Sequence, residues 1–432
     1  MKEIVYPKKK DWNEIVVRPV KDLKTIKKVV KPILNKVARK GDKALKKFAY
    51  EYDHVELDEI LVSRKEIYEA EEQISDELKA AIKTAKRNIE KFHEAQKEGV
   101  LEMETMPGVV CRRKSVPISK IGLYIPSGTA PLFSSVLMLG IPANIAGCEQ
   151  LVMCTPTDRN GKVNPTTLYT ANLVGIDIIA KIGGAQAIAA MAYGTESVPR
   201  VYKIFGPGNQ YVTAAKQIVS QQGTAIDMPA GPSEVAVYAD ESSVPSFVAA
   251  DLLSQAEHGV DSQVLLVTTD EQVIKSVKKE IKKQLQDLPR KDIASKSLEN
   301  SMLVLVRNSR EAIDLLNQYG AEHLILAVKN ADFIADGIIN AGSVFLGNYS
   351  PESAGDYASG TNHVLPTNGF AKSYSGVSLD SFMKKITYQS LTAEGLSSLA
   401  STIETLAEAE HLYAHKNAVS IRMKYLADKE NA

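Results

Sequence analysis

The stretch Asp251-Leu-Leu-Ser-Gln-Ala-Glu-His-Gly259 carries polar side chains at a spacing that suits chemistry. If it forms the end of a helix, with Gly259 as the C′ residue, Asp251, Gln255 and His258 lie on one face, because they are four and three residues apart. Carboxylate, amide and imidazole groups are metal ligands or acid–base groups. A solvated helix face, with a histidine near its negative end, also explains the pattern. Zinc needs three or four protein ligands, so a metal site requires residues from elsewhere in the chain.

A second candidate is the adjacent pair Glu322-His323, because most histidines lie in the second half of the chain. Neighbouring residues in regular structure point in different directions, so the pair can serve one centre only from a strand end or a loop. Gly320, just before the pair, favours such a position. A buried, hydrogen-bonded histidine at the start of an apolar strand is the alternative interpretation of His323.

Two glycine-containing loops, Gly183-Gly-Ala-Gln186 and Gly206-Pro-Gly-Asn209, stand where a predicted strand is followed by a predicted helix. Glycine there lets backbone N–H groups approach a phosphate at the helix N-terminus. Neither loop has the G-x-G-x-x-G spacing, and tight strand–helix turns contain glycine without any ligand. A nucleotide site and a structural turn therefore both remain open.

Composition excludes several classes of protein. The chain has 432 residues, 44% hydrophobic and 24% charged, which predicts a globular protein with at least two domains. Its 52 basic and 52 acidic residues cancel, so no bulk charge attracts nucleic acid or an anionic membrane. There is neither a long apolar run nor a signal-like N-terminus, and the three cysteines have no ligand spacing, so we expect a cytoplasmic protein.

Alternating strand and helix patterns occur over roughly 120–235 and again over 245–350, which predicts parallel sheets. The expected fold is α/β, with two doubly wound, Rossmann-like domains, a helical N-terminal region and a helical C-terminal extension. Residues 351–368 are expected to form a long glycine- and serine-rich loop, which carries Glu352, Asp356 and His363. The predicted parts are an arm at 1–24, a first αβ domain of 25–123 plus 235–377, a second of 124–234, and the extension at 378–432.

Several motifs together resemble the histidinol dehydrogenase family over essentially the whole chain. They include Gly183-Gly-Ala-Gln-Ala-Ile-Ala189, Ile226-Asp-Met-Pro-Ala-Gly-Pro-Ser-Glu234, Asp251 to His258, Ser350-Pro-Glu-Ser-Ala-Gly-Asp356 and Gly360-Thr-Asn-His-Val-Leu-Pro366. The resemblance implies a zinc enzyme that oxidises L-histidinol to L-histidine through the aldehyde and reduces two NAD. It also implies a homodimer in which the C-terminal segment, with Glu410 and His415, completes the partner's site.

The resemblance further assigns roles to individual residues. Asp251 is not carried over as a ligand. Cys148 and Cys154 lie in apolar settings and have no role in the expected reaction. The implied zinc ligands are Gln255, His258, Asp356 and His415; the acid–base pair is Glu322 and His323; the NAD contacts are Tyr124, Gln186 and Asn209; and the substrate contacts are Ser233, Gln255, His258, His323, Asp356, His363, Glu410 and His415.

Two other functions compete with this interpretation. A related zinc- and NAD-dependent dehydrogenase would use the same scaffold on another polar alcohol. A zinc hydrolase with Glu322 as its base would leave the glycine loops and the two αβ domains without a role.

Overall fold

The computed structural model describes residues 1–19, 23–127, 130–229 and 231–430. Four short parts of the predicted features lie outside the described residues. They are 20–22 of the arm, 128–129 of the loop 126–131, 230 of the motif Ile226–Glu234, and 431–432 of the extension. The chain divides into two units. The first consists of 1–96 and 118–382, and the second of 97–117 and 383–432. Each is described by itself.

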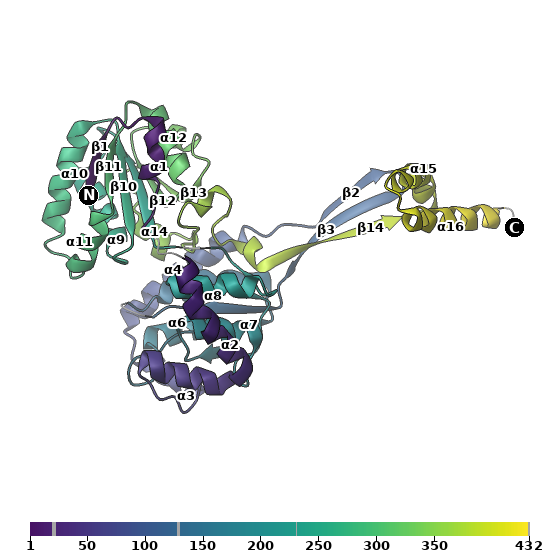
Figure 1. Cartoon of the computed structure of the whole chain (residues 1–432), viewed down its shortest axis with the longest axis horizontal. Coiled ribbons are helices and arrows are strands. Elements are labelled where there is room, and N and C mark those ends of the chain that lie inside the picture. The colour runs from purple at the N-terminus through teal and green to yellow at the C-terminus, as the bar shows by residue number, and fades with distance from the viewer. Residues whose placement is uncertain (20–22, 128–129, 230, 431–432) are drawn as a thin grey trace. The chain divides into compact units, whose positions relative to one another are not determined.

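A six-stranded sheet of the first unit has the order β1-β11-β10-β9-β12-β13, and all its neighbouring strands are parallel (Figure 1). From β9 the chain adds strands in one direction and then returns to add β12 and β13 on the other side, which defines a doubly wound sheet. The strands are β1 (Lys2–Val5), β9 (Glu234–Ala239), β10 (Gln263–Thr268), β11 (Met302–Leu305), β12 (Ala321–Ala327) and β13 (Ala341–Leu346).

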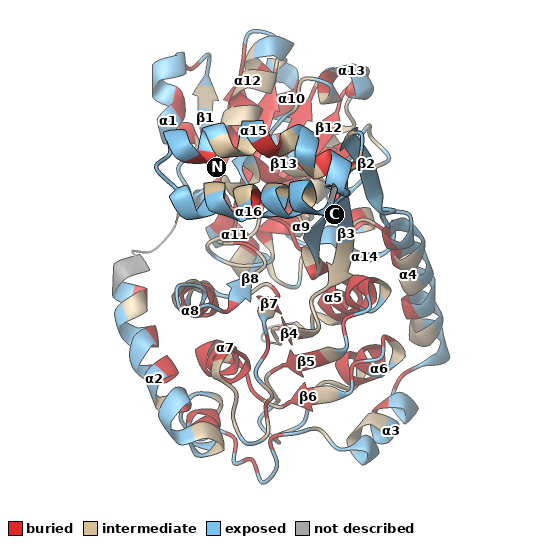
Figure 2. Ribbon diagram, turned by 90° about the vertical axis from the view of Figure 1, so that its right-hand side faces the viewer, coloured by how far each residue is buried: buried red, intermediate tan, exposed pale blue. Residues whose placement is uncertain are grey.

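Both faces of this sheet are covered by helices, so its central strands are buried throughout and mostly apolar (Figure 2). Successive residues of a strand point to opposite faces. Val235 and Val237 accordingly pack against α9 (Pro245–Ala256), α10 (Glu271–Gln284) and α11 (Lys291–Glu299). Ala236 and Tyr238 pack against the helices of the other face, which are α1 (Trp12–Ile15), α12 (Ser309–Tyr319) and α13 (Ala331–Ala335).

A five-stranded parallel sheet of the same unit has the order β6-β5-β4-β7-β8, which is the doubly wound order again. The α/β class predicted from the alternating pattern is therefore confirmed. The strands are β4 (Lys120–Tyr124), β5 (Gln150–Cys154), β6 (Ile178–Ala180), β7 (Lys203–Phe205) and β8 (Ala225–Ile226). The helices that follow them are α5 (Phe133–Ala146), α6 (Pro165–Leu173), α7 (Gly184–Tyr193) and α8 (Gln210–Ser220).

The N-terminal helices pack around the five-stranded sheet. Helix α2 (Leu23–Phe48) lies on α7 and α8, while α3 (Arg64–Glu72) contacts α6 and α4 (Asp76–Glu94) contacts α5. This differs from the predicted grouping of 25–123 with 235–377. An amphipathic pattern shows that a helix has an apolar face, but it does not show which sheet that face meets.

The segments predicted to be an arm and a loop both contain regular structure. The arm at 1–24 supplies β1 as a parallel edge strand beside β11, then the 3₁₀ turn η1 (Lys9–Asp11) and α1. The predicted loop at 351–368 begins with a short helix, α14 (Glu352–Tyr357). The arm was expected to be extended or irregular, and β1 agrees with the first alternative. Helices α1 and α14 were missed because elements of four to six residues are too short to show a periodicity. The remaining short turns are η2 (Ala49–Asp53), η3 (Phe370–Lys372) and η4 (Leu379–Phe382).

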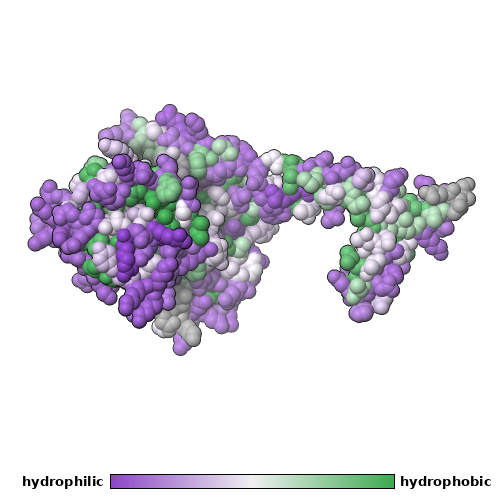
Figure 3. Space-filling view, turned by 90° about the horizontal axis from the view of Figure 1, so that it is seen from above, coloured by the Kyte–Doolittle hydropathy of each residue, from purple (hydrophilic) through white to green (hydrophobic). Residues whose placement is uncertain are grey.

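The second unit is an antiparallel sheet followed by two helices. Its strand order is β14-β3-β2, formed by β2 (Leu101–Met106), β3 (Val109–Pro117) and β14 (Met383–Leu391), and the helices are α15 (Ala393–Ala409) and α16 (Tyr413–Glu430). The expectation of a purely helical extension from 378 is thus wrong at β14. Apolar side chains stay exposed on this unit, among them Leu406, Leu412 and Ile421 (Figure 3).

Within the described residues, every helix is either too short or too polar to cross a membrane.

Candidate active site

A pocket of about 320 Å³ in the first unit gathers residues that are far apart in the sequence. One wall comes from loops at the carboxyl ends of β4 and β7, represented by Pro126 and Gly206. The opposite wall comes from the start of β12 and from the segments after α9 and β13. Eight of the predicted site residues line this pocket: Asn209, Ser233, Gln255, His258, Glu322, His323, Asp356 and His363.

The two sheets face the pocket with opposite ends of their strands. In doubly wound sheets, ligands bind outside the carboxyl ends of the strands. The five-stranded sheet follows this rule, because Pro126 and Gly206 follow its adjacent strands β4 and β7. The six-stranded sheet does not, because Glu322 and His323 are the second and third residues of β12. The pair thus lies at a strand end, one of the two positions from which adjacent residues were expected to reach one centre, and both residues line the pocket.

The helix that contains Asp251 and Gln255 ends earlier than expected. Helix α9 begins with Pro245 at its first position and ends at Ala256, with Glu257 as C-cap. His258 therefore lies in the following turn, and Gly259 is not the C′ residue. Gln255 and His258 line the pocket and Asp251 does not. Burial raises the pKa of the Asp251 carboxyl to about 7.

Gln255 is fully buried, and its amide orientation follows from its neighbours. Nε2 lies 3.3 Å from the carbonyl oxygen of Glu234, which can only accept, so the nitrogen must face that oxygen. The same nitrogen lies 3.0 Å from His323 Nδ1. The amide oxygen Oε1 has no hydrogen-bond partner among the described residues. A buried acceptor without a partner costs about 1–3 kcal/mol, which indicates a ligand at this oxygen.

Three more atoms near Gln255 also lack hydrogen-bond partners in the described part of the chain. They are Glu352 Oε2, Asp356 Oδ1 and His323 Nε2. His323 Nε2 and Asp356 Oδ1 are 3.3 Å apart, but they do not meet hydrogen-bond geometry. Several unpartnered, electron-rich atoms in one buried place fit a bound cation.

A group with metal-ligand geometry lies at the same place. One ligand atom each of His258, Glu352 and Asp356 lies within 4.8 Å of the others. Together with Gln255 Oε1 they form a mixed nitrogen and oxygen set without thiolate, which suits a zinc ion that keeps an open position. Glu352 is 1% exposed and was missed as a site residue. Its spacing of four from Asp356 on α14 is the sequence signal that could have identified it.

The Glu322–His323 pair is buried among other carboxylates. His323 Nδ1 lies 3.7 Å from Glu322 Oε2 and 3.8 Å from Glu352 Oε1. Burial raises the pKa of Glu322 to about 8, against the opposing effect of His323. Burial lowers the pKa of His323, but the surrounding carboxylates, Glu352 foremost, outweigh it and raise that pKa to about 10. The pocket therefore favours the protonated form of both groups, compared with an ordinary carboxyl and an ordinary imidazole.

His258 and His363 are the other two imidazoles of the pocket. Desolvation in the pocket lowers the pKa of both rings, which favours the neutral form that can act as a ligand or an acceptor. His363 Nδ1 lies 2.8 Å from the Asp356 carbonyl oxygen, and Nε2 lies 3.3 Å from Ser135 Oγ. His363 therefore ties the segment after α14 to helix α5.

The pocket wall that contains the loop Gly206–Asn209 is built on a glycine that no other residue can replace. Gly206 has φ +128°, and a Cβ at this position would lie 2.0 Å from the Tyr124 carbonyl oxygen. Asn209 caps α8 by accepting from the Tyr211 and Val212 N–H groups. A buried pair missed from the sequence fixes this loop: Lys216 Nζ donates to the Gly206 C=O at 2.9 Å and pairs with Asp227, which accepts from the Gly206 N–H at 2.8 Å.

Tyr124 and Gln186, the other two expected NAD contacts, do not line the pocket. Both are buried, and the Tyr124 hydroxyl accepts from the Gly184 N–H at 3.0 Å, at the start of α7. Burial raises the pKa of Tyr124 to about 12. The structure thus brings Tyr124 to the loop that contains Gln186, but leaves their contact with a nucleotide as a prediction.

The cysteines are poorly suited to nucleophilic catalysis. Cys148 and Cys154 are buried, and burial raises their thiol pKa values to about 11 and about 12. A thiolate is the reactive form, so both are inert at neutral pH.

Glu410 and His415 belong to the second unit. Glu410 follows α15 and His415 lies near the start of α16, and both side chains are exposed there. Their predicted contacts with substrate and zinc stay predictions.

Fold and pocket together define a doubly wound α/β protein in which the buried Glu322–His323 pair lies beside a group of side chains with metal-ligand geometry. The family model described as histidinol dehydrogenase matches residues 16–423. The histidinol dehydrogenase of Bacteroides fragilis (strain YCH46) is 59% identical over 98% of this chain and 99% of its own length, and that of Escherichia coli O6:H1 is 50% identical over 97% and 98%. The crystal structure of the Elizabethkingia anophelis histidinol dehydrogenase, 53% identical, superposes with a TM-score of 0.97 over 99% of both chains.

The chain belongs to the histidinol dehydrogenase family, and it is an oxidoreductase.

Proposed function

We propose that this enzyme oxidises L-histidinol to L-histidine through L-histidinal, the last two steps of histidine biosynthesis, using two NAD and a bound zinc ion. The observation that carries the proposal is one pocket with three parts. Unpartnered ligand atoms of Gln255 and Asp356 lie beside the Glu322–His323 pair, and the glycine loop ending at Asn209 lines the opposite wall. A metal, an acid–base pair and a dinucleotide are what oxidation of a cationic alcohol requires.

The proposed zinc ligands in the first unit are Gln255, His258 and Asp356, with Glu352 or His415 as the fourth. When bound, zinc supplies a cation that orients the substrate's imidazole and amine and lowers the pKa of nearby protonated groups, without any redox role.

In the first oxidation, His323 acts as the base. Its Nε2 takes the proton of the alcohol while a hydride leaves the substrate carbon for NAD, which yields the aldehyde and NADH. For this step the ring must be neutral, which a bound zinc ion would favour because a nearby cation lowers the pKa of the imidazolium. Nδ1 must then carry the ring hydrogen, which the Glu322 and Glu352 carboxylates favour from 3.7 and 3.8 Å, and the Gln255 amide nitrogen, 3.0 Å away, must move from Nδ1. Gln255 Nε2 cannot donate to a protonated Nδ1, so in this state it keeps only its bond to the Glu234 C=O.

In the second oxidation, Glu322 acts as the base. It takes a proton from a water molecule that adds to the aldehyde, and the resulting diol gives a hydride to a second NAD, which yields the carboxylic acid. The aldehyde must stay bound while NADH is exchanged. Ser233 and His363 line the same pocket and are proposed to hold the substrate meanwhile.

We further propose a homodimer in which Glu410 and His415 of the partner complete each site. Both side chains are exposed in the second unit, which also exposes Leu406, Leu412 and Ile421. Exposed apolar groups of this kind are the usual material of subunit interfaces. Glu410 would bind the substrate ammonium group, and His415 would be a zinc ligand.

The proposed function predicts two NADH per L-histidinol, with formation abolished by a zinc chelator and restored by added zinc. NADH absorbance, measured alongside a panel of other amino alcohols, checks this. A preference for another alcohol would instead support the related dehydrogenase named above. Turnover of an ester or amide without NADH formation would support a zinc hydrolase.

The pH dependence of aldehyde oxidation should report the Glu322 carboxyl. A base must be ionised, and burial raises the pKa of Glu322 to about 8, so the rate should rise as pH increases to about that value and then level off. Bound zinc would move the midpoint to lower pH, because a nearby cation favours the carboxylate. Single-turnover rates with L-histidinal at several pH values measure this. A rate that falls over the same interval would contradict the assignment.

A further inference from the structure

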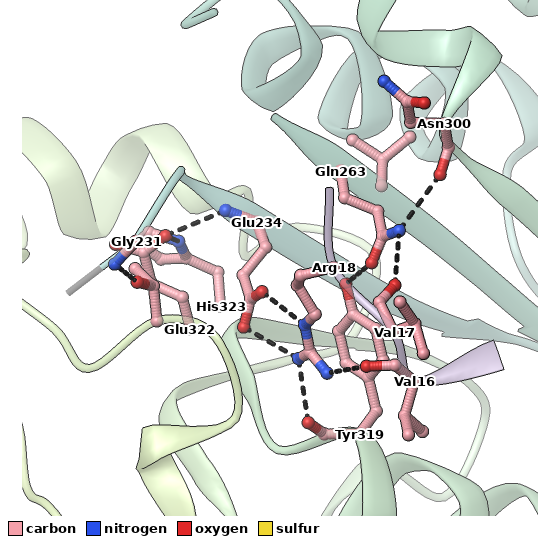
Figure 4. A network of polar contacts seen from close by, with 12 residues as sticks. Val16, Val17, Arg18, Gly231, Glu234, Gln263, Asn300, Tyr319, Glu322 and His323 are labelled. Atoms are coloured by element: carbon pink, nitrogen blue, oxygen red, sulfur yellow. Dashed lines mark hydrogen bonds and ion pairs between the residues drawn. The ribbon is translucent and has the colours of Figure 1, made fainter. Parts of the chain in front are cut away.

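The peptide groups of residue 234 lie between two side chains of the candidate site. The Glu234 N–H donates to Glu322 Oε2 at 2.9 Å (Figure 4). The Glu234 C=O accepts from Gln255 Nε2 at 3.3 Å. Under the proposed function, Glu322 activates water and Gln255 binds zinc. A displacement of this single residue would therefore disturb the base and the metal ligand together.

A buried arginine holds the side chain of Glu234. Arg18 Nε and Nη2 donate to its two carboxylate oxygens at 2.8 and 2.9 Å, and the two side chains are 5% and 1% exposed. Two parallel hydrogen bonds between planar groups fix orientation as well as distance. A lysine would preserve the charge at this position but not the paired geometry.

Arg18 is fixed in turn by the element that leads into the catalytic strand. Its guanidinium stacks 3.5 Å from the centre of the Tyr319 ring, and Nη2 also donates to the Tyr319 C=O at 2.8 Å. The Tyr319 hydroxyl donates to Gln263 Oε1 at 2.9 Å. Tyr319 is the last residue of α12, and β12 with Glu322 begins two residues later. The guanidinium thus joins the start of β9 to the approach to β12.

The arm that carries Arg18 lies outside the pocket. None of residues 1–19 lines it. The arm is instead anchored in the six-stranded sheet, because β1 pairs with β11 and the Trp12 and Ile15 side chains are buried in the core. Arg18 Nη1 donates to the Val16 C=O at 2.8 Å, so the arm's own backbone orients the guanidinium. A rigid outer segment therefore reaches the site through Arg18 and Glu234. It also contacts the start of β10, because the Val17 C=O accepts from Gln263 Nε2 at 3.1 Å.

We propose that Arg18 is a positioning residue of the reaction: it fixes Glu234 and, through the peptide groups of that residue, sets the positions of Glu322 and Gln255. The inference rests on the proposed function, since it assigns Arg18 a role in those two oxidations. Substitution of Arg18 should therefore impair both water activation and metal binding, although Arg18 is neither the proposed base nor a proposed metal ligand.

The first test is Arg18→Lys, which retains the buried positive charge. Per folded molecule, we expect the rate of aldehyde oxidation to fall about 10- to 100-fold, the range for loss of an outer-shell partner, and zinc to transfer faster to a competing chelator. The KM for NAD should not change, because Asn209 and its loop lie on the opposite wall of the pocket. Single-turnover kinetics, zinc transfer to a chromogenic chelator and circular dichroism provide the three readouts.

The second test separates positioning from charge balance. Arg18→Met alone leaves the Glu234 carboxylate buried without a partner, so this variant should be strongly destabilised. The double variant Arg18→Met/Glu234→Gln removes both charges and should recover much of the thermal stability. If the paired geometry positions the site, aldehyde oxidation and zinc retention stay impaired in the double variant.

Lys9→Met is the matched control. Lys9 is an arm cation that pairs with Asp314 at 2.8 Å on the exposed surface, where such a pair contributes little. This variant should behave as wild type in every assay. Wild-type aldehyde oxidation and zinc retention in Arg18→Lys, or full recovery of both in the double variant, would overturn the proposal. If the wild-type enzyme does not oxidise histidinol, the proposed function fails, whereas zinc retention still tests Arg18.

Discussion

Replacement of Glu322 by glutamine is expected to slow aldehyde oxidation by about 10²- to 10⁴-fold, the usual contribution of a general base. Oxidation of the alcohol should change far less, because only the second step needs an activated water molecule. The substitution keeps the shape of the side chain, and the new amide oxygen can still accept from the Glu234 N–H. Single-turnover measurements that start from L-histidinol and from L-histidinal separate the two half-reactions.

Glu299→Gln is a suitable control for this experiment. It makes the same chemical change at an exposed position at the end of α11, so both half-reactions should proceed at wild-type rates. The division of roles would be refuted if Glu322→Gln slowed both half-reactions equally. In that case Glu322 would act on the substrate in both steps, or would only support His323.

Loss of zinc on replacement of His258 or Asp356 by asparagine is the second large effect that we expect. Removal of a direct ligand should weaken zinc binding by more than the roughly 10- to 100-fold that loss of an outer-shell partner costs. Activity should fall in proportion to zinc content, which metal analysis after gel filtration measures. His54→Asn is the control, because His54 is exposed with φ +57°, a conformation that asparagine tolerates well.

The fourth ligand is decided by two further variants in the same experiment. Glu352→Gln should lose zinc if the first unit holds the metal by itself, and His415→Asn should lose it if the second unit contributes. If His415 acts on the partner's site, a mixture of inactive Glu322→Gln and inactive His415→Asn enzymes should regain part of the activity after subunit exchange. Full zinc in all four ligand variants would reject the metal site.

The sequence predicted the sheets well where glycine turns bracket apolar runs. The sequence pattern predicts a helix over Gly184–Tyr193 and a strand over Lys203–Phe205, and α7 and β7 have these bounds, because each is delimited by a turn and is largely buried. Strand β14 escaped prediction for the opposite reason. Its side chains are largely exposed, so it has no apolar alternation, and it exists through its pairing with β3.

The candidate site was predictable in its members, but not in its supporting contacts. Gln255 and His258 are marked by their own spacing, and the family resemblance added Asp356. The pairing of Arg18 with Glu234 joins residues 216 positions apart and arises only when the arm packs on the sheet. Lys216 and Asp227 were missed likewise, since a buried lysine carries no sequence signal until its partner is known. The domain to which the N-terminal helices belong depends in the same way on packing.

The two sheets face the pocket with opposite strand ends, so the helices beside them point dipoles of opposite sign into it. Helix α8 starts at the pocket wall behind Asn209, so its partial positive end faces inward. Helix α9 ends at the other wall beside Gln255 and His258, so its partial negative end faces inward. The backbone alone therefore favours an anionic pyrophosphate on one side and a cation on the other, before any side chain contributes. In the proposed reaction, the helix dipoles would favour binding of the dinucleotide at the α8 wall and of the cationic groups at the α9 wall.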